Sequence, residues 1–247
     1  LNEGDENFLV SLSTPIDTTF ADALATGTIT DDDIPPGLFV ADASAVTEGQ
    51  TSQFVVTLAA ASALEVTFDY RTWDGTATSA QDYTSLPLST ATISAGSLGV
   101  TILVVTTDDV LDEVAAETYT LSISSAVNST ISDASGAGTI NDNDSPPQIF
   151  VSDAAANEGD TISFWVSLSA LSDLTVGVQY TTYDGTATIP SDYTQVSNSA
   201  FSIPAGSLSV QIQAVTIEDT VYEDNEVLTV SLGALSNVSA GDFRASR

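Results

Sequence analysis

The sequence contains no cysteine, methionine, histidine or lysine, and its only basic residues are Arg71, Arg244 and Arg247. Without cysteine and histidine there is no disulfide, no thiolate nucleophile, no imidazole base and no zinc site of the usual kinds. Stability must therefore come from packing or from a bound metal ion. No apolar run approaches the roughly 18 residues of a membrane-spanning helix, so we expect no direct membrane insertion.

Acidic residues dominate the charged side chains. The 34 aspartates and glutamates against three arginines give a formal net charge of −31. This charge excludes nucleic acid and anionic membranes as partners, because both are themselves negative, and it favours cations. Hydrophobic residues make up 43% of the chain, which is enough to build cores, so the composition is not that of a disordered acidic tail.

The sequence repeats itself at an offset of 110 or 111 residues. TWDGTAT at 72–78 returns as TYDGTAT at 182–188, and GTITDDD at 27–33 returns as GTINDND at 138–144. Such periodicity indicates a tandem array. We predict a C-terminal fragment of a repeat at 1–33, a complete repeat at 34–144, and a repeat lacking its final strand at 145–247. We expect the chain to be a piece of a longer protein with more repeats.

Hydrophobic residues alternate with polar ones inside each repeat, as in Phe54, Val56 and Leu58. This period of two, interrupted by glycine, aspartate and proline, predicts strands and turns. About seven strands per repeat predict an all-β fold of tandem immunoglobulin-like antiparallel β-sandwiches, arranged as a rod. Four aromatic residues are predicted to pack in the cores: Trp73, Trp165, Tyr83 and Tyr193.

Many carboxylates fall at the ends of the predicted strands. Turns two strands apart lie at the same end of a sandwich, so we expect Glu48, Asp82, Asp108 and Asp142 to converge. Carboxylates so close together repel one another. Ca²⁺ accepts about six to eight hard oxygens in flexible geometry and suits such a cluster better than Mg²⁺. The alternative is that these acids form a solvated surface.

The order of the motifs resembles that of the Calx-beta repeat family. The motifs are T-E-G, D-G-T-A-T, S-D-Y, I-x-A-G-S, an acid pair, E-x-x-E and D-x-D, and they cover nearly the whole chain. The resemblance implies a seven-stranded β-sandwich whose loops at one end bind calcium through carboxylates. The stretch NDNDSPPQIF is also similar to the calcium linkers of cadherins, which imply calcium and a sandwich as well.

The resemblance assigns Ca²⁺ ligands in all three parts of the chain. The fragment supplies Glu3, Glu6, Asp31, Asp32 and Asp33. The middle repeat supplies Glu48, Asp82, Asp108, Asp109, Glu113, Glu117, Asp142 and Asp144. The final repeat supplies Glu158, Asp192, Glu218, Asp219, Glu223 and Glu226. Two departures, Asn143 in place of an acid and an extra residue between Glu113 and Glu117, imply fewer ions in the middle repeat.

Each acidic stretch that ends a repeat is followed by a double proline, Pro35-Pro36 or Pro146-Pro147. Proline fixes the backbone, so the joint between repeats is expected to be short and stiff. We predict calcium-binding spacer repeats of a secreted or cell-surface protein, such as an adhesin stalk, matrix or fibre component. In this reading calcium rigidifies the joints, and neighbouring repeats are the main partners.

Three other interpretations follow from the same residues. The first is a calcium-dependent recognition module that binds a glycan or a protein through its loops. The second is a hydrolase with paired carboxylates; we expect no enzyme, because each acid has a simpler use as a ligand. The third is self-association, in which the 1–33 fragment adds a strand to another copy's final repeat.

Overall fold

The computed structural model describes residues 2–241 and 244–246, and their regular structure consists of strands. In this part of the chain no helix is long and apolar enough to cross a membrane. The chain divides into two compact units. The first comprises Leu1–Asp108 and Ala116–Asn141, and the second comprises Asp109–Ala115 and Asp142–Arg247.

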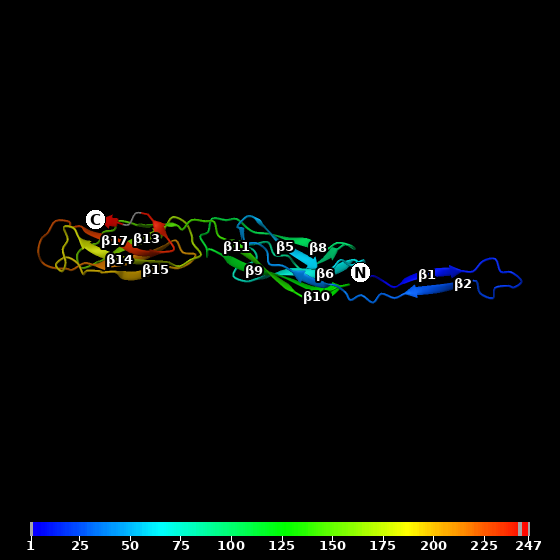
Figure 1. Cartoon of the computed structure of the whole chain (residues 1–247). Coiled ribbons are helices and arrows are strands. Elements are labelled where there is room, and N and C mark those ends of the chain that lie inside the picture. Colours follow the sequence, from blue (N-terminus) through cyan, green and yellow to red (C-terminus); the bar gives the residue numbers. More distant parts are fainter. Residues whose placement is uncertain (1, 242–243, 247) are drawn as a thin grey trace. The chain divides into compact units, whose positions relative to one another are not determined.

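The first unit contains a β-sandwich, as the alternation predicted (Figure 1). One sheet has the order β10-β3-β5-β8, from Thr130–Ile131, Gly37–Val40, Thr51–Leu58 and Gly99–Val105. The other has the order β4-β11-β9-β6-β7, from Val46–Thr47, Ser135–Asn141, Glu117–Val127, Val66–Asp74 and Ser89–Ile93. The short strands β10 and β4 pair in parallel with β3 and β11, and the other pairs are antiparallel.

The inner faces of both sheets supply the core of this sandwich. Every second residue of β5 is buried, and Phe54 and Val56 are inaccessible to solvent. This follows from strand geometry, in which successive side chains point to opposite faces. Tyr83 stacks on Tyr119 with ring centroids 4.4 Å apart, which closes the core below the loop between β6 and β7.

The second unit repeats this architecture. One sheet has the order β16-β13-β12-β18, from Ser209–Val215, Thr161–Leu168, Gln148–Val151 and Ser239–Ala240. The other has the order β15-β14-β17-β19, from Ser199–Ile203, Val176–Asp184, Leu228–Ser236 and Arg244–Ser246. The strand β19 pairs antiparallel with β17, as β11 pairs with β9. In the second unit β19 therefore takes the place that β11 has in the first, whereas we predicted a final repeat without its final strand.

The residues before the first sandwich form a hairpin. Strands β1 (Glu6–Ser11) and β2 (Leu24–Ile29) pair antiparallel, with Glu6 opposite Ile29 (Figure 1). Phe8 and Leu9 are both exposed on this hairpin. Phe8 occupies the position that buried Tyr119 holds in the next repeat.

The double prolines use their carbonyl groups as hydrogen-bond acceptors. The Pro36 carbonyl accepts the Thr130 N–H at 3.0 Å, and the Pro147 carbonyl accepts the Ser239 N–H at 2.8 Å. Proline lacks a backbone donor but keeps its acceptor. Each proline pair is thereby fixed to a short strand at the edge of its own sandwich.

The aromatic residues divide into a buried and an exposed pair. Tyr83 and Tyr193 are 1% and 0% exposed, which confirms the prediction that they pack in the cores. Trp73 and Trp165 are 48% and 52% exposed, so the same prediction is wrong for them. Both tryptophans occupy outward positions of their strands, and the guanidinium of Arg71 lies 3.5 Å from the ring centroid of Trp73.

Candidate metal centre

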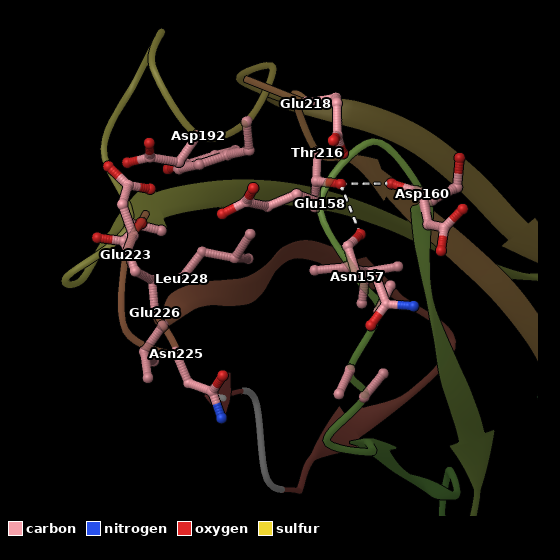
Figure 2. A pocket seen from close by; sticks show the side chains of 18 of the residues that line it. Asn157, Glu158, Asp160, Asp192, Thr216, Glu218, Glu223, Asn225, Glu226 and Leu228 are labelled. Atoms are coloured by element: carbon pink, nitrogen blue, oxygen red, sulfur yellow. Dashed lines mark hydrogen bonds between the residues drawn. The ribbon is translucent and has the colours of Figure 1, made fainter. Parts of the chain in front are cut away.

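Acidic side chains gather in a cavity of about 1270 Å³ at one end of the second sandwich (Figure 2). Three loops line it: the one before β13, the one after β14 and the one that connects β16 to β17. They meet because antiparallel strands of a sandwich return to the same end. The side chains that face the cavity include Glu158, Asp192, Glu218, Glu223 and Glu226.

Three of these carboxylates approach one another closely. Asp192, Glu223 and Glu226 each offer an oxygen within 4.8 Å of the others. Because Ca–O distances are about 2.3–2.6 Å, one calcium ion can reach three oxygens at this spacing. Figure 2 shows Asp192 and Glu223 facing the same space, with the carboxylate of Glu158 extending toward them. The donors are all hard oxygens, which fit Ca²⁺.

The proximity of these groups perturbs their protonation. Desolvation, followed by the negative charges of Asp192, Asp219 and Glu158, raises the pKa of Glu223. Desolvation, followed by Asp192 and Glu223, also raises the pKa of Glu226. The pKa of Asp192 is lowered, mainly by the hydrogen bond from the Thr188 N–H. The negative charge on the two glutamates is therefore less favourable than on an isolated glutamate.

The motif D-G-T-A-T followed by S-D-Y positions Asp192. One carboxylate oxygen of Asp192 accepts the Thr188 N–H at 2.6 Å and the Thr188 hydroxyl at 3.1 Å. The neighbouring Tyr193 is buried, and its hydroxyl donates to Asp184 at 2.8 Å. The loop is thus anchored on both sides of the candidate ligand.

Gly185 brings this loop against the segment that carries Glu226. A Cβ atom at Gly185 would lie 2.3 Å from the carbonyl oxygen of Val227, so no other residue fits without a shift of the backbone. On the opposite side of the cavity, the Thr216 hydroxyl donates to the carbonyls of Asp160 at 2.7 Å and Asn157 at 3.1 Å (Figure 2). These bonds fix the turn that carries Glu158.

The first unit builds the same anchor in its own loop. The Thr78 N–H and hydroxyl both donate to one oxygen of Asp82, and the Tyr83 hydroxyl donates to Asp74 at 2.6 Å. Asp82 and Glu117 offer oxygens within 4.8 Å of each other, as their counterparts Asp192 and Glu226 do. Asp82 is buried here, whereas Asp192 is half-buried.

The remaining predicted ligands of the middle repeat lie in its loops. Glu48 is buried in the turn before β5, and Gly49, with φ of +73°, lies against the Cβ atom of Asp108. Asp109 and Asp144, both in the second unit, offer oxygens within 4.8 Å of each other. Asp142 accepts the Asp144 N–H at 3.2 Å, and Asp108 lies beside Gly49. Glu113 is half-buried in the Asp109–Ala115 segment.

Other predicted ligands lie outside the close groups. Glu218 lines the cavity against Gly159, and Asp219 accepts the Val221 N–H at 2.6 Å. In the hairpin, Asp31 accepts the N–H groups of Glu3 and Asp33. Within the described part of the chain, the following seven predicted ligands do not belong to a group of three carboxylates whose oxygens lie within 4.8 Å of one another: Glu3, Glu6, Asp31, Asp32, Asp33, Glu218 and Asp219.

The sequence analysis missed the residues that hold the ligands in place. Thr78 and Thr188 orient Asp82 and Asp192, and Thr216 fixes the turn of Glu158. A signal for them was present, because each threonine recurs in the other repeat at an offset of 110 residues. Recurrence alone does not distinguish a ligand from the residue that orients it.

A β-sandwich with carboxylate-rich loops at one end defines a class of metal-binding module. The profile of the Calx-beta domain matches residues 31–144 and 141–243, so the chain belongs to the Calx-beta domain family. Comparison with curated proteins gives no match.

Two crystal structures of tandem domains are similar to this chain. CBD12 from CALX1.2 has 16% sequence identity and a TM-score of 0.41, with 81% of this chain and 80% of that chain covered. The calcium-binding domain CBD12 of CALX1.1 has the same identity and TM-score, with 83% of this chain and 82% of that chain covered.

Proposed function

We propose that the chain binds Ca²⁺ through the loop ends of its Calx-beta domains and serves as a spacer of a secreted or cell-surface protein. The observation that carries the proposal is the convergence of Asp192, Glu223 and Glu226, with Asp192 oriented by Thr188. The matching anchor of Asp82 by Thr78 supports the same role for the middle repeat.

An ion at this position has a structural consequence. Asp192 follows β14, whereas Glu223 and Glu226 precede β17. A shared ion would therefore join two loops whose carboxylates otherwise repel one another. Weak sites with dissociation constants of about 10⁻⁴–10⁻³ M are filled at the calcium concentrations outside cells. Such sites suit a spacer whose stiffness depends on extracellular calcium.

Calorimetric titration of the full chain with Ca²⁺ tests the binding step. The triple variant Asp192→Asn, Glu223→Gln and Glu226→Gln should lose at least one bound ion. A matched triple variant, Asp17→Asn, Asp22→Asn and Glu65→Gln, removes the same charge from exposed acids elsewhere and should keep the full stoichiometry. Equal stoichiometry in the two variants would contradict the proposed ligands.

Small-angle scattering with and without chelator tests the spacer role. If calcium stiffens the joints between repeats, its removal should broaden the distribution of molecular dimensions while the circular dichroism of the strands persists. An identical distribution in both conditions would leave calcium binding in place but contradict the mechanical role.

Recognition of a glycan or protein is the second candidate function. Trp73 and its counterpart Tyr183 are both about half exposed on equivalent strands, and exposed aromatic rings stack on apolar faces of ligands. Saturable binding in a glycan screen with calcium present that is lost both in Trp73→Ala and in the ligand triple variant would favour this calcium-dependent function over a spacer.

A further inference from the structure

Two buried contacts of the same geometry occur in this chain, outside the candidate metal centre. Asn2 forms an isolated parallel bridge with Ser62, and Asp112 forms one with Ser172. The members of each pair are 110 residues from their counterparts, and all four residues are buried. Each contact joins a loop residue that precedes a glutamate to a turn of sequence S-x-L.

In both contacts a backbone carbonyl of the loop accepts the same two hydrogen bonds, one from a backbone N–H and one from the serine hydroxyl. The Asn2 carbonyl accepts the Ala63 N–H at 2.9 Å and the Ser62 hydroxyl at 3.3 Å. The Asp112 carbonyl accepts the Asp173 N–H at 3.0 Å and the Ser172 hydroxyl at 3.0 Å. Because the shared acceptor is a backbone carbonyl, the geometry does not depend on which residue occupies the loop position.

The serine turn is held rigid from both sides. The Ser172 hydroxyl accepts the Leu174 N–H at 3.1 Å, and the Ser172 carbonyl accepts the Gly206 N–H at 2.9 Å. Ser62 makes the equivalent bonds with Leu64 at 3.0 Å and Gly96 at 2.8 Å. The turn is therefore preorganised to receive the loop, which reduces the entropic cost of the contact.

The second contact carries an additional charged bond. The Ser172 hydroxyl also lies 2.9 Å from a carboxylate oxygen of Asp112, and hydrogen bonds to charged groups are stronger than neutral ones. The same loop position in the final repeat is Tyr222, which is 93% exposed. The residue at this loop position is therefore buried in the two repeats where it contacts a serine turn, and it is exposed in the final repeat.

We infer that the S-x-L turn of each repeat is a docking site for the acidic loop of a neighbouring repeat. The Ser62 turn receives the loop of Asn2, and the Ser172 turn receives the Asp109–Ala115 segment through Asp112. The partner is recognised by a backbone carbonyl, and an Asp at the loop position adds a bond from the serine hydroxyl. This latch does not require a metal ion.

Disulfide trapping tests the latch directly, because the chain contains no native cysteine. Partners in a β-bridge lie about 4.8 Å apart, within the Cα separation of about 4.4–6.8 Å that a disulfide spans. In calcium-free buffer, the full chain with Asp112→Cys and Ser172→Cys should oxidise to an intramolecular disulfide. The full chain with Asn2→Cys and Ser62→Cys should do the same.

The matched control combines Tyr222→Cys with Ser172→Cys. Tyr222 lies in the loop before β17, whereas Ser172 lies at the other end of β14, a strand of nine residues or about 30 Å. This pair should remain reduced under the same conditions. Oxidation of the Asp112 and Ser172 pair at a rate no greater than that of the control would overturn the latch.

Proteolysis of the full chain measures the latch without new cysteines. Loss of the serine hydroxyl in Ser172→Ala should raise the rate of cleavage after Glu113 by an acid-specific protease about tenfold. The variant Ser62→Ala removes the equivalent hydroxyl from the other turn and should leave cleavage after Glu113 unchanged. Equal rates in Ser172→Ala and the parent would also overturn the latch.

Discussion

The variant Thr188→Val separates the orientation of Asp192 from its charge. Valine removes the hydroxyl that donates to Asp192 at 3.1 Å, but it keeps the backbone N–H at 2.6 Å and nearly the same side-chain volume. Loss of such an outer partner weakens metal binding by about 10–100-fold. Because one of the two hydrogen bonds remains, we expect the lower end of this range, about tenfold.

This loss of affinity converts into a thermal shift. At a calcium concentration about 100 times the parent dissociation constant, one bound ion stabilises the parent repeat by about 2.7 kcal/mol and the variant by about 1.4 kcal/mol. A domain of about 100 residues gains about 4–8 °C per kcal/mol. Calcium should therefore raise the unfolding midpoint by about 11–22 °C in the parent and by about 6–11 °C in Thr188→Val.

The two tryptophans allow the second unit to be observed alone. In a Trp73→Phe background, Trp165 is the only tryptophan, so its fluorescence reports the unfolding of the final repeat. Each variant is compared with its own chelated midpoint, which removes any effect of the substitution on the calcium-free protein. Thr194→Val, which changes an exposed threonine two residues from Asp192, should retain the parent shift. Equal calcium shifts in Thr188→Val and the parent would refute the orienting role of Thr188.

Three further predictions concern pH, the tyrosine anchor and the core. The raised pKa values of Glu223 and Glu226 mean that the folded state binds more protons than the unfolded state above their ordinary value of 4.5. The calcium-free unfolding midpoint should therefore rise, and calcium affinity should fall, as the pH is lowered from about 7 to about 5. Below that interval the lowered pKa of Asp192 acts in the opposite direction, and a midpoint independent of pH would contradict both assignments. Tyr193→Phe removes the bond to Asp184 and should cost about 1.5 kcal/mol in urea unfolding; an unchanged free energy of unfolding would show that the bond does not anchor the loop. Phe54→Ala should destabilise the first sandwich by about 3–5 kcal/mol, whereas the partly exposed Phe39→Ala should cost much less, and similar losses would contradict the placement of Phe54 in the core.

The repeats and strands could be predicted because their causes are local in the sequence. The alternation at Phe54, Val56 and Leu58 requires only that successive side chains of a strand face opposite ways, and all three are buried as expected. The same alternation places Trp165, which lies between Phe164 and Val166, on the outer face of its strand, and it does the same for Trp73, which follows Thr72. The prediction that the two tryptophans pack in the cores neglects this alternation, and both are exposed.

The composition and repetition of the sequence determined the all-β repeats, the acidic charge and the placement of carboxylates at strand ends. Only the tertiary structure decided which carboxylates meet, because Asp192 and Glu223 are 31 residues apart and come together only when β14 and β17 pair in one sheet. It likewise decided the contact of Asp112 with Ser172, since a backbone carbonyl that accepts a distant hydroxyl leaves no signature in the residue type. Spatial convergence is a property of the folded sheets, whereas periodicity is a property of the chain.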